Sequence, residues 1–368
     1  MALIYGSCED SYRKTTALIN RIRYQLEAGT PERTLRDNTE KEGRQIQAYL
    51  EEKTHRILEQ SGFSAQGLPL QTQAREVIVP GKEVEPERLV ELVEDCTVEE
   101  ALKSEILKNP VPYEDPEQAV HISLDDVGAK KQKEVRLKEP LESPAPVKKR
   151  EYVQNTVVHV HKKNTRYLLN GDGVLNVLGM LLAFLLHNQL GGCPWVFFVD
   201  GHSLYSTLLS FFSWRSQLTV ILDWFHLEKK CKELLSMACK GSLIRNSILD
   251  KLLPLLWHGL VEQAVESLRQ LPESQIKNQE ELLHLIRYLE KNRPMIPAYE
   301  IRKQLELRNS SNRGEKANDL LVAQRQKNNG MSWSKAGSVA LASVTALKKN
   351  QEYLTWFNKH VLEFKLVA

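Results

Sequence analysis

Two short runs of consecutive apolar residues, Trp195–Val199 and Leu218–Leu222, are each followed directly by an aspartate, Asp200 and Asp223. Continuous runs rich in β-branched and aromatic residues are typical of strands buried on both faces of a sheet. Apolar side chains between the two runs recur at helical spacing, which predicts a strand, a crossover helix and a parallel strand. Both aspartates are therefore expected at the carboxyl edge of the sheet, where ligands of such sheets bind.

The part of the chain before these runs has a period of two, which is typical of half-buried strands. Val120–Leu124 and Tyr152–His161 alternate apolar and polar residues, and Tyr167–Leu169 is a further short run. The pattern predicts three strands that lie beside one another as antiparallel neighbours. The first of them is expected to end at Asp125 and Asp126.

Helical patterns occupy both ends of the chain. Residues 11–60 predict two helices, the second with Thr30 as N-cap and Pro31 at its first helical position. An acidic helix is expected over residues 86–107, and residues 242–308 carry apolar stripes of helices alone. The C-terminal part predicts one helix from about Asn312 and another after Ser338.

Composition excludes several classes of protein. The chain has 368 residues with 42% hydrophobic and 26% charged residues, which is ordinary for a folded globular protein. The five cysteines contain no Cys-x-x-Cys pair, as expected for reduced thiols. No signal-peptide pattern and no apolar stretch long enough to span a membrane is evident. We expect a cytoplasmic protein with no membrane partner.

The net charge of +3 conceals a division between two segments. Residues 81–119 contain twelve Asp or Glu and four Lys or Arg, whereas residues 291–335 contain ten Lys or Arg and four Asp or Glu. A basic segment of that size suits the phosphate backbone of a nucleic acid. A solvated surface is the alternative interpretation.

The order of predicted elements, three strands, a helix, a strand, a helix, a strand and then helices, is that of an RNase H-like fold with a mixed five-stranded sheet. Aspartates follow three of the predicted strands, where this fold places metal ligands. Phosphodiester cleavage requires such carboxylates, because two metal ions about 4 Å apart must be held against the reacting phosphate. The pattern therefore favours a metal-dependent nuclease or transferase.

Four motifs resemble those of the DDE transposases of bacterial insertion sequences, in their Mutator-like branch. The motifs are Asp125 after the first strand, VDGHSLY around Asp200, ILDWFHLEKKC around Asp223, and SSNRGEKANDLLVAQRQKNNGMSWS around Glu315. The resemblance covers roughly residues 113–345. It implies a helical insertion before the glutamate helix, here residues 242–308, and an N-terminal helical region outside the match.

The resemblance also implies roles for individual residues. Asp125, Asp200 and Glu315 would be the catalytic ligands of two Mg²⁺ or Mn²⁺ ions. Asp223 and His226 would form an accessory pair, since their spacing places both on one helical face. Asp126 is an accessory candidate as well, because the sequence leaves open which residue of Asp125-Asp126 is the first ligand.

The expected partner is double-stranded DNA, both the element's ends and the target, bound by a homo-oligomer in the bacterial nucleoid. Basic residues of the C-terminal half would contact phosphates: Arg302, Lys303, Arg308, Arg313, Lys316, Arg325 and Lys327. The predicted domains are an N-terminal, mostly helical region that binds DNA ends, the first part of the catalytic core, a helical insertion, and the completion of the core with C-terminal helices. Their bounds are residues 1–112, 113–241, 242–309 and 310–368.

Alternatives stay open at each candidate. Asp200-Gly201 is also a turn pattern, Asp223 a suitable helix N-cap, and Glu315 follows Asn312 at the spacing of a capping box. For the whole protein, the alternatives are an RNase H-fold nuclease without strand transfer and a non-catalytic DNA-binding relic of a transposase.

Overall fold

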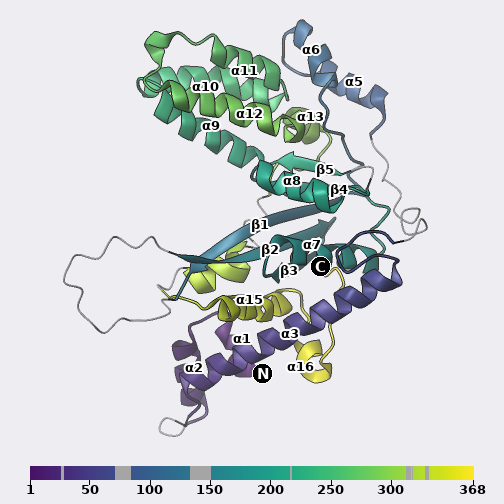
Figure 1. The fold of residues 1–368 in the computed structure, drawn as a ribbon, viewed down its shortest axis with the longest axis vertical. Coiled ribbons are helices and arrows are strands. Elements are labelled where there is room, and N and C mark those ends of the chain that lie inside the picture. Colours follow the sequence, from purple (N-terminus) through teal and green to yellow (C-terminus); the bar gives the residue numbers. More distant parts are fainter. Residues whose placement is uncertain are drawn as a thin grey trace, which may run out of the picture. The chain divides into compact units, whose positions relative to one another are not determined.

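The computed structural model describes residues 1–25, 29–70, 84–132, 151–215, 218–311, 316, 318–327 and 331–368 (Figure 1). The chain divides into two compact units, each built from separate segments of the sequence. Unit 1 comprises Met1–Val77, Leu124–Gly191 and Arg313–Ala368, and unit 2 comprises Ile78–Ser123 and Gly192–Asn312. The division into four consecutive domains stays a prediction.

A mixed five-stranded sheet has the strand order β3-β2-β1-β4-β5. Its members are β1 (Val120–Lys130), β2 (Tyr152–Lys162), β3 (Thr165–Gly171), β4 (Trp195–Val199) and β5 (Thr219–Leu222). β1 pairs with β4 and β4 with β5 in parallel, whereas β2 and β3 are antiparallel. The α/β class and the mixed five-stranded sheet are confirmed, and the strand order is consistent with an RNase H-like fold.

The strands β4 and β5 of unit 2 are buried along their whole length, as their uninterrupted apolar sequences predict. The crossover between them contains α8 (His202–Phe211), which packs on β4. Phe212, which follows α8, places its ring 5.6 Å from that of Trp195 and 5.7 Å from that of Phe197. Aromatic packing therefore fixes the crossover helix against the strand that it follows.

The rest of unit 2 is helical. Its α-helices are α5 (Pro86–Glu94), α6 (Glu100–Leu107), α9 (Trp224–Ala238), α10 (Ser242–Trp257), α11 (Val261–Arg269), α12 (Gln279–Asn292) and α13 (Tyr299–Gln304). The helix α9 packs on α10 and α12, while α5 packs on α6 and α13. Residues 242–308 form helices without a strand, as predicted.

Unit 1 packs helices on both faces of β2 and β3. Its helices are α1 (Ala2–Ser7), α2 (Tyr12–Ile22), α3 (Glu32–Gln60), α7 (Val174–His187), the π-helix η3 (Asp319–Lys327), α15 (Lys335–Lys349) and α16 (Tyr353–Lys359). On β3, the Tyr167 ring stacks on Phe184 of α7, and Asn170 donates to Ser343 of α15. Residues three apart on a strand point to opposite faces, so α7 and α15 cover opposite sides. The helix α3 lies along α15 (Figure 1).

Several predicted boundaries were wrong. The strand β1 continues through Asp125 and Asp126 to Lys130 instead of ending at the two acids. The acidic segment forms two helices, α5 and α6, because Asp, Thr and Val between them have low helix propensity. Pro31 is the N-cap of α3, one residue later than predicted, and has no capping side chain.

The last long helix also begins earlier than its apolar pattern suggests. It starts at Lys335, because the Ser334 hydroxyl accepts a hydrogen bond from the backbone N–H of Gly337 and caps the first turn. In the part of the chain that the structure describes, no helix combines the length and apolar character needed to cross a membrane.

The close approach of α3 to α15 depends on a glycine. A Cβ atom added to Gly43 would overlap the backbone of Ala340, which cannot move aside as a side chain can. We expect Gly43→Ala to lower the free energy of unfolding by about 1–3 kcal/mol, the usual cost of overpacking. Gly179→Ala in α7 is the matched control, since its added Cβ would meet nothing within 4 Å. Thermal unfolding should show destabilisation at position 43 alone, and equal midpoints would contradict the packing.

Candidate functional site

The carboxyl ends of β4 and β5 place two of the candidate aspartates at one edge of the sheet in unit 2. Val199 pairs with Leu222, so Asp200 and Asp223 are the next residues on neighbouring parallel strands. The backbone N–H of Asp223 donates to the carbonyl of Val199 at 3.0 Å. Asp200 is exposed, whereas Asp223 retains only 2% of its accessible surface.

Asp223 is the N-cap of α9, as the capping alternative predicted. Its Oδ1 accepts from the backbone N–H of Phe225 at 2.8 Å and of His226 at 3.2 Å. The Nδ1 atom of His226 lies 3.4 Å from the same oxygen, so the structure brings the accessory pair together. Burial alone would raise the pKa of the Asp223 carboxyl, but hydrogen bonds from His226 and Ser311 outweigh it and lower the pKa.

The polar loop that follows the helical insertion is attached to this same helix end, a feature that the sequence reasoning missed. The backbone N–H of Ser311 donates to Oδ2 of Asp223. The carbonyl of Asn309 accepts from the N–H of Trp224 at 3.0 Å, and Asn309 Nδ2 donates to the carbonyl of Tyr299 at 2.7 Å. Tyr299 in turn donates its hydroxyl to the carbonyl of Leu222 at 2.7 Å. The loop is therefore fixed to the end of β5 immediately before Glu315.

Asp125 and Asp126 lie within β1 in unit 1. Burial alternates from Val120 to Leu124, but both aspartates are exposed, and alternation resumes in the opposite phase at Val127. Such a change of phase is what an extra residue produces in a strand, and β-bulges commonly redirect side chains at active sites. In a regular strand with one buried face, only one of two adjacent side chains faces solvent.

Each of these aspartates has its own hydrogen-bond partner. Asp125 accepts at Oδ2 from Asn318 Nδ2 at 2.6 Å and at Oδ1 from the backbone N–H of Asp126 at 2.8 Å. Asp126 accepts at Oδ1 from the hydroxyl of Thr156 on β2 at 2.6 Å. Asp126 is thus bound to the neighbouring strand, while Asp125 is bound to the segment that follows Glu315.

The helix η3 is joined to the end of β1 as well. The backbone N–H of Trp333 donates to the carbonyl of Lys130 at 2.8 Å, and its indole N–H donates to the carbonyl of Gln326 at 3.2 Å. Gln326 Nε2 donates to the carbonyl of Ser338 in α15 at 3.0 Å. These contacts hold η3 beside the second half of β1.

Arg302, predicted to contact DNA, is instead fully buried. It donates to both carboxylate oxygens of Glu114, at 2.8 and 2.7 Å, and to the carbonyl of Arg308 at 3.1 and 3.0 Å. The side chains of Arg302 and Glu114 are 0% and 1% exposed. A planar guanidinium that binds a carboxylate through two hydrogen bonds is a structural pair, so the assignment of Arg302 to the DNA surface is corrected.

Arg325 is corrected for the same reason, since it is 1% exposed. Its Nε donates to the carbonyl of Ser7 at 2.9 Å, and its guanidinium carbon lies 5.0 and 5.3 Å from the ring centroids of Tyr12 and Trp333. It joins η3 to the N-terminal helices instead of facing solvent. Of the remaining candidates, Lys303, Lys316 and Lys327 are exposed, Arg308 is half-buried, and Arg313 lies outside the described residues.

Glu315 also lies outside the described residues. Within the described ranges, no group of three or more His, Cys, Asp or Glu side chains is arranged to hold a metal ion. Asp125 and Asp200 both offer exposed carboxylates, which are the hard oxygen ligands that Mg²⁺ and Mn²⁺ accept.

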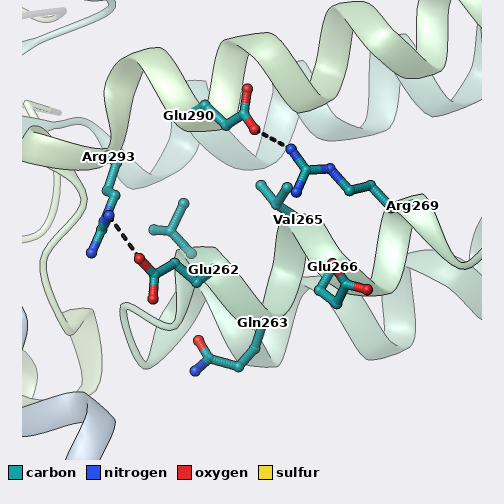
Figure 2. A pocket seen from close by; sticks show the side chains of 8 residues that line it. Glu262, Gln263, Val265, Glu266, Arg269, Glu290 and Arg293 are labelled. Atoms are coloured by element: carbon teal, nitrogen blue, oxygen red, sulfur yellow. Dashed lines mark hydrogen bonds and ion pairs between the residues drawn. The ribbon is translucent and has the colours of Figure 1, made fainter.

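A hollow of about 540 Å³ lies between α11 and α12 in unit 2 (Figure 2). Two ion pairs cross it, Arg269 with Glu290 at 2.6 Å and Arg293 with Glu262 at 2.7 Å. None of the residues that line it is a predicted site residue. The two pairs neutralise four of the five charged groups on its wall, and Glu266 accepts a hydrogen bond from Gln270 Nε2 at 2.9 Å.

No protein-family model matches this chain, and no curated protein matches it. Among solved structures, the chain is similar to the "Drosophila P element transposase strand transfer complex" with 11% identity and a TM-score of 0.22. The similarity covers 96% of this chain and 87% of that chain. A TM-score of that size is too low to establish a shared fold or function.

Removing Arg302 should affect stability rather than DNA binding. We expect Arg302→Met to cost about 3–5 kcal/mol of unfolding free energy, because Glu114 would remain buried without its counter-charge. The double variant Arg302→Met/Glu114→Leu should recover most of the loss, and the exposed neighbour Lys303→Met should stay within about 0.5 kcal/mol of the parent. Chemical unfolding measures all three, and a stable Arg302→Met protein with weakened DNA binding would restore the original assignment.

Proposed function

We propose that this chain is a DDE-type transposase of the Mutator-like branch of bacterial insertion sequences. It would cut double-stranded DNA at the ends of a mobile element and join each end to target DNA. Water would break the bond between phosphorus and the 3′-oxygen, leaving a 3′-hydroxyl on one side and a 5′-phosphate on the other. That hydroxyl would then attack a target phosphodiester and displace a second 3′-hydroxyl.

One observation carries the proposal: in each unit, a residue close to Glu315 in sequence is hydrogen-bonded to a candidate acidic residue. Ser311, four residues before Glu315, donates to Asp223, and Asn318, three residues after it, donates to Asp125. Within each unit, a residue close to Glu315 in sequence is thus hydrogen-bonded to a candidate acidic residue, which supports including Glu315 in the same proposed ligand set.

The order of the sheet provides a second, independent support. Ser123 of β1 pairs with Phe198 of β4, and Asp125 and Asp200 are each two residues further along their strands. Equal positions on parallel neighbours are where a pair of metal-binding carboxylates is expected. The helical insertion also lies where the resemblance requires it, between β5 and the segment that contains Glu315.

Each acidic residue has a distinct part in the proposed chemistry. Asp125, Asp200 and Glu315 would hold two divalent cations, Mg²⁺ or Mn²⁺, which activate the attacking oxygen and stabilise the leaving oxygen when bound. Asp223 is occupied by three backbone N–H donors, so its part is to hold the loop before Glu315 in place. Asp126, bound by Thr156, would hold β1 in the conformation in which Asp125 is exposed as well.

The requirement for a negative charge at Asp200 can be tested by substitution. We expect Asp200→Asn to abolish metal-dependent nicking of DNA that carries the element's ends, because an amide keeps the shape but removes the charge that the cations need. Folding should be retained, since Asp200 is exposed. Asp250 is an exposed carboxylate on α10. The matched control is Asp250→Asn, which should nick DNA at the parent rate. Nicking by the Asp200→Asn protein at the parent rate would refute the assignment.

The same assay separates the alternatives for the whole protein. Nicking followed by joining of the new 3′-hydroxyl to a second duplex is expected of a transposase. Nicking without joining would favour a nuclease of the same fold, and DNA binding without nicking would favour a non-catalytic relic.

The exposed lysines Lys316 and Lys327, which follow Glu315 in the chain, should contribute to phosphate binding. We expect Lys316→Ala/Lys327→Ala to weaken binding to any duplex and to reduce the slope of log K against log salt by about two, since each phosphate contact contributes about 0.9. Lys251→Ala/Lys291→Ala removes the same charge from exposed positions of α10 and α12 and should leave the slope unchanged. Titrations at several salt concentrations measure both, and equal slopes would place the DNA path elsewhere.

A further inference from the structure

The helix α2 in unit 1 carries positive charge with few acidic counterparts. Residues 11–25 contain four Arg or Lys and no Asp or Glu. Arg13, Arg21 and Arg23 are exposed and form no ion pair with another described residue. Lys14 has one acidic partner, Asp10, at 3.8 Å. Most of the charge of α2 is therefore not neutralised by the side chains around it.

One side of α2 is fixed against the rest of unit 1. Tyr12, Thr15 and Thr16 are buried on this side. The ring centroid of Tyr12 lies 5.0 Å from the guanidinium carbon of Arg325 and 6.3 Å from the ring centroid of Trp333. Because these contacts fix the rotation of α2 about its axis, they also determine which of its side chains face outward.

The outward side of α2 contains a row of basic residues. Asn20 fixes the end of the helix, because its Nδ2 donates to the carbonyl of Thr30 at 3.1 Å and its Oδ1 accepts from the N–H of Thr30 at 3.0 Å. Arg13, Ala17 and Arg21 are all exposed and four residues apart, so they form one row along the helix. We call this row the basic face of α2. A rise of 1.5 Å per residue separates Arg13 from Arg21 by about 12 Å.

A helix side that only meets water looks different in the same unit. The exposed side of α3 carries both signs of charge, and its charges pair four residues apart: Arg33 with Asp37, Arg44 with Glu40, and Arg56 with Glu52. Each such pair stabilises a helix by about 0.2–0.5 kcal/mol. The arginines of α2 lack this gain, and the macrodipole of α2 opposes the two basic residues in its first turn. Local stability therefore does not account for the charge of α2, whereas binding of a polyanion does.

We propose that the basic face of α2 contacts the phosphate backbone of double-stranded DNA. The separation of Arg13 from Arg21 is close to the width of the major groove, which is about 12 Å and admits an α-helix. Contacts to phosphates position a duplex without reading its sequence. This inference rests on the proposed function, because that proposal supplies the duplex as the partner.

An anionic lipid surface is the other partner that a basic helix can fit, but α2 suits it poorly. A helix that lies on a membrane buries a broad apolar face among the lipids. The exposed apolar residues within α2 are Leu18 and Ile22, at 58% and 65% exposure. Residues four apart differ by about 40° around the helix axis, so these two form only a narrow stripe. The charge and the narrow stripe together favour DNA.

The test is binding of the full-length protein to duplex DNA at several salt concentrations. We expect Arg13→Gln/Arg21→Gln to reduce the slope of log K against log salt by about two and to weaken binding by about 10–100-fold at 0.1 M salt. The loss should be the same for duplexes of unrelated sequence, because phosphates carry no sequence information. The thermal midpoint should stay at the parent value, since both residues are exposed.

Lys359→Gln/Lys365→Gln is the matched control. Both lysines are exposed in unit 1, and their replacement removes the same total charge. This variant should keep the parent slope. Equal loss of slope in the two double variants would mean that net charge alone matters, and it would overturn the inference.

The remaining outcomes separate the inference from the proposed function. If the parent binds duplex DNA and Arg13→Gln/Arg21→Gln keeps its slope, the inference fails while the transposase proposal stands. If that variant loses slope but the parent never nicks DNA, the inference holds and the transposase proposal fails. A parent protein that binds no duplex refutes both.

Vesicles of phosphatidylglycerol provide the comparison with lipid. We expect Arg13→Gln/Arg21→Gln to change binding to these vesicles far less than binding to duplex DNA. Loss of vesicle binding with unchanged binding to duplex DNA would make the basic face a lipid-binding surface and would overturn the inference.

Discussion

The candidate site depends on one kind of interaction, which each unit contains once: a hydrogen bond from a residue near Glu315 in sequence to an acidic residue of the sheet. In unit 2, a backbone N–H donates to the buried Asp223 carboxylate; in unit 1, a side-chain amide donates to the exposed Asp125 carboxylate. Hydrogen bonds to charged groups contribute about 1.5–3 kcal/mol each, more than neutral ones.

The buried ion pair between Arg302 and Glu114 is a second interaction on which the structure of unit 2 depends. Burial opposes ionisation of Glu114, but Arg302 and His121 outweigh it and lower the pKa of the carboxyl from its ordinary value of 4.5 to about 2. A carboxyl whose pKa falls on folding contributes fully above pH 4.5, and its contribution is lost as the pH falls toward 2. The pair therefore joins the segment before β1 to α13 throughout the neutral range.

Much of the fold was predictable because the physical signals were local. The strands β4 and β5 are apolar at every position, which few structures other than a doubly covered sheet allow. Asp223 as a cap was likewise readable from its place before Trp224. The extent of β1 was not predictable, because two adjacent exposed acids are typical of the end of a strand. The strand continues through them, and Asn318 and Thr156 donate hydrogen bonds to Asp125 and Asp126.

The basic residues show why the rest of the site could not be predicted. Arg302, Lys303 and Arg325 are equivalent in a count of charge, yet two are buried and one is exposed. Their difference depends on partners distant in sequence: Glu114 for Arg302, and Ser7 and Tyr12 for Arg325.

A buried guanidinium that joins η3 to the N-terminal helices has a consequence for the candidate site. Arg325 donates to Ser7 at the end of α1 and lies against the ring of Tyr12 at the start of α2, seven residues along the chain from Asn318. Any shift of α1 and α2 must therefore break the Ser7 hydrogen bond or move η3 with them. The position of Asn318, and through it the Asp125 carboxylate, is thereby coupled to the N-terminal helices within the same unit.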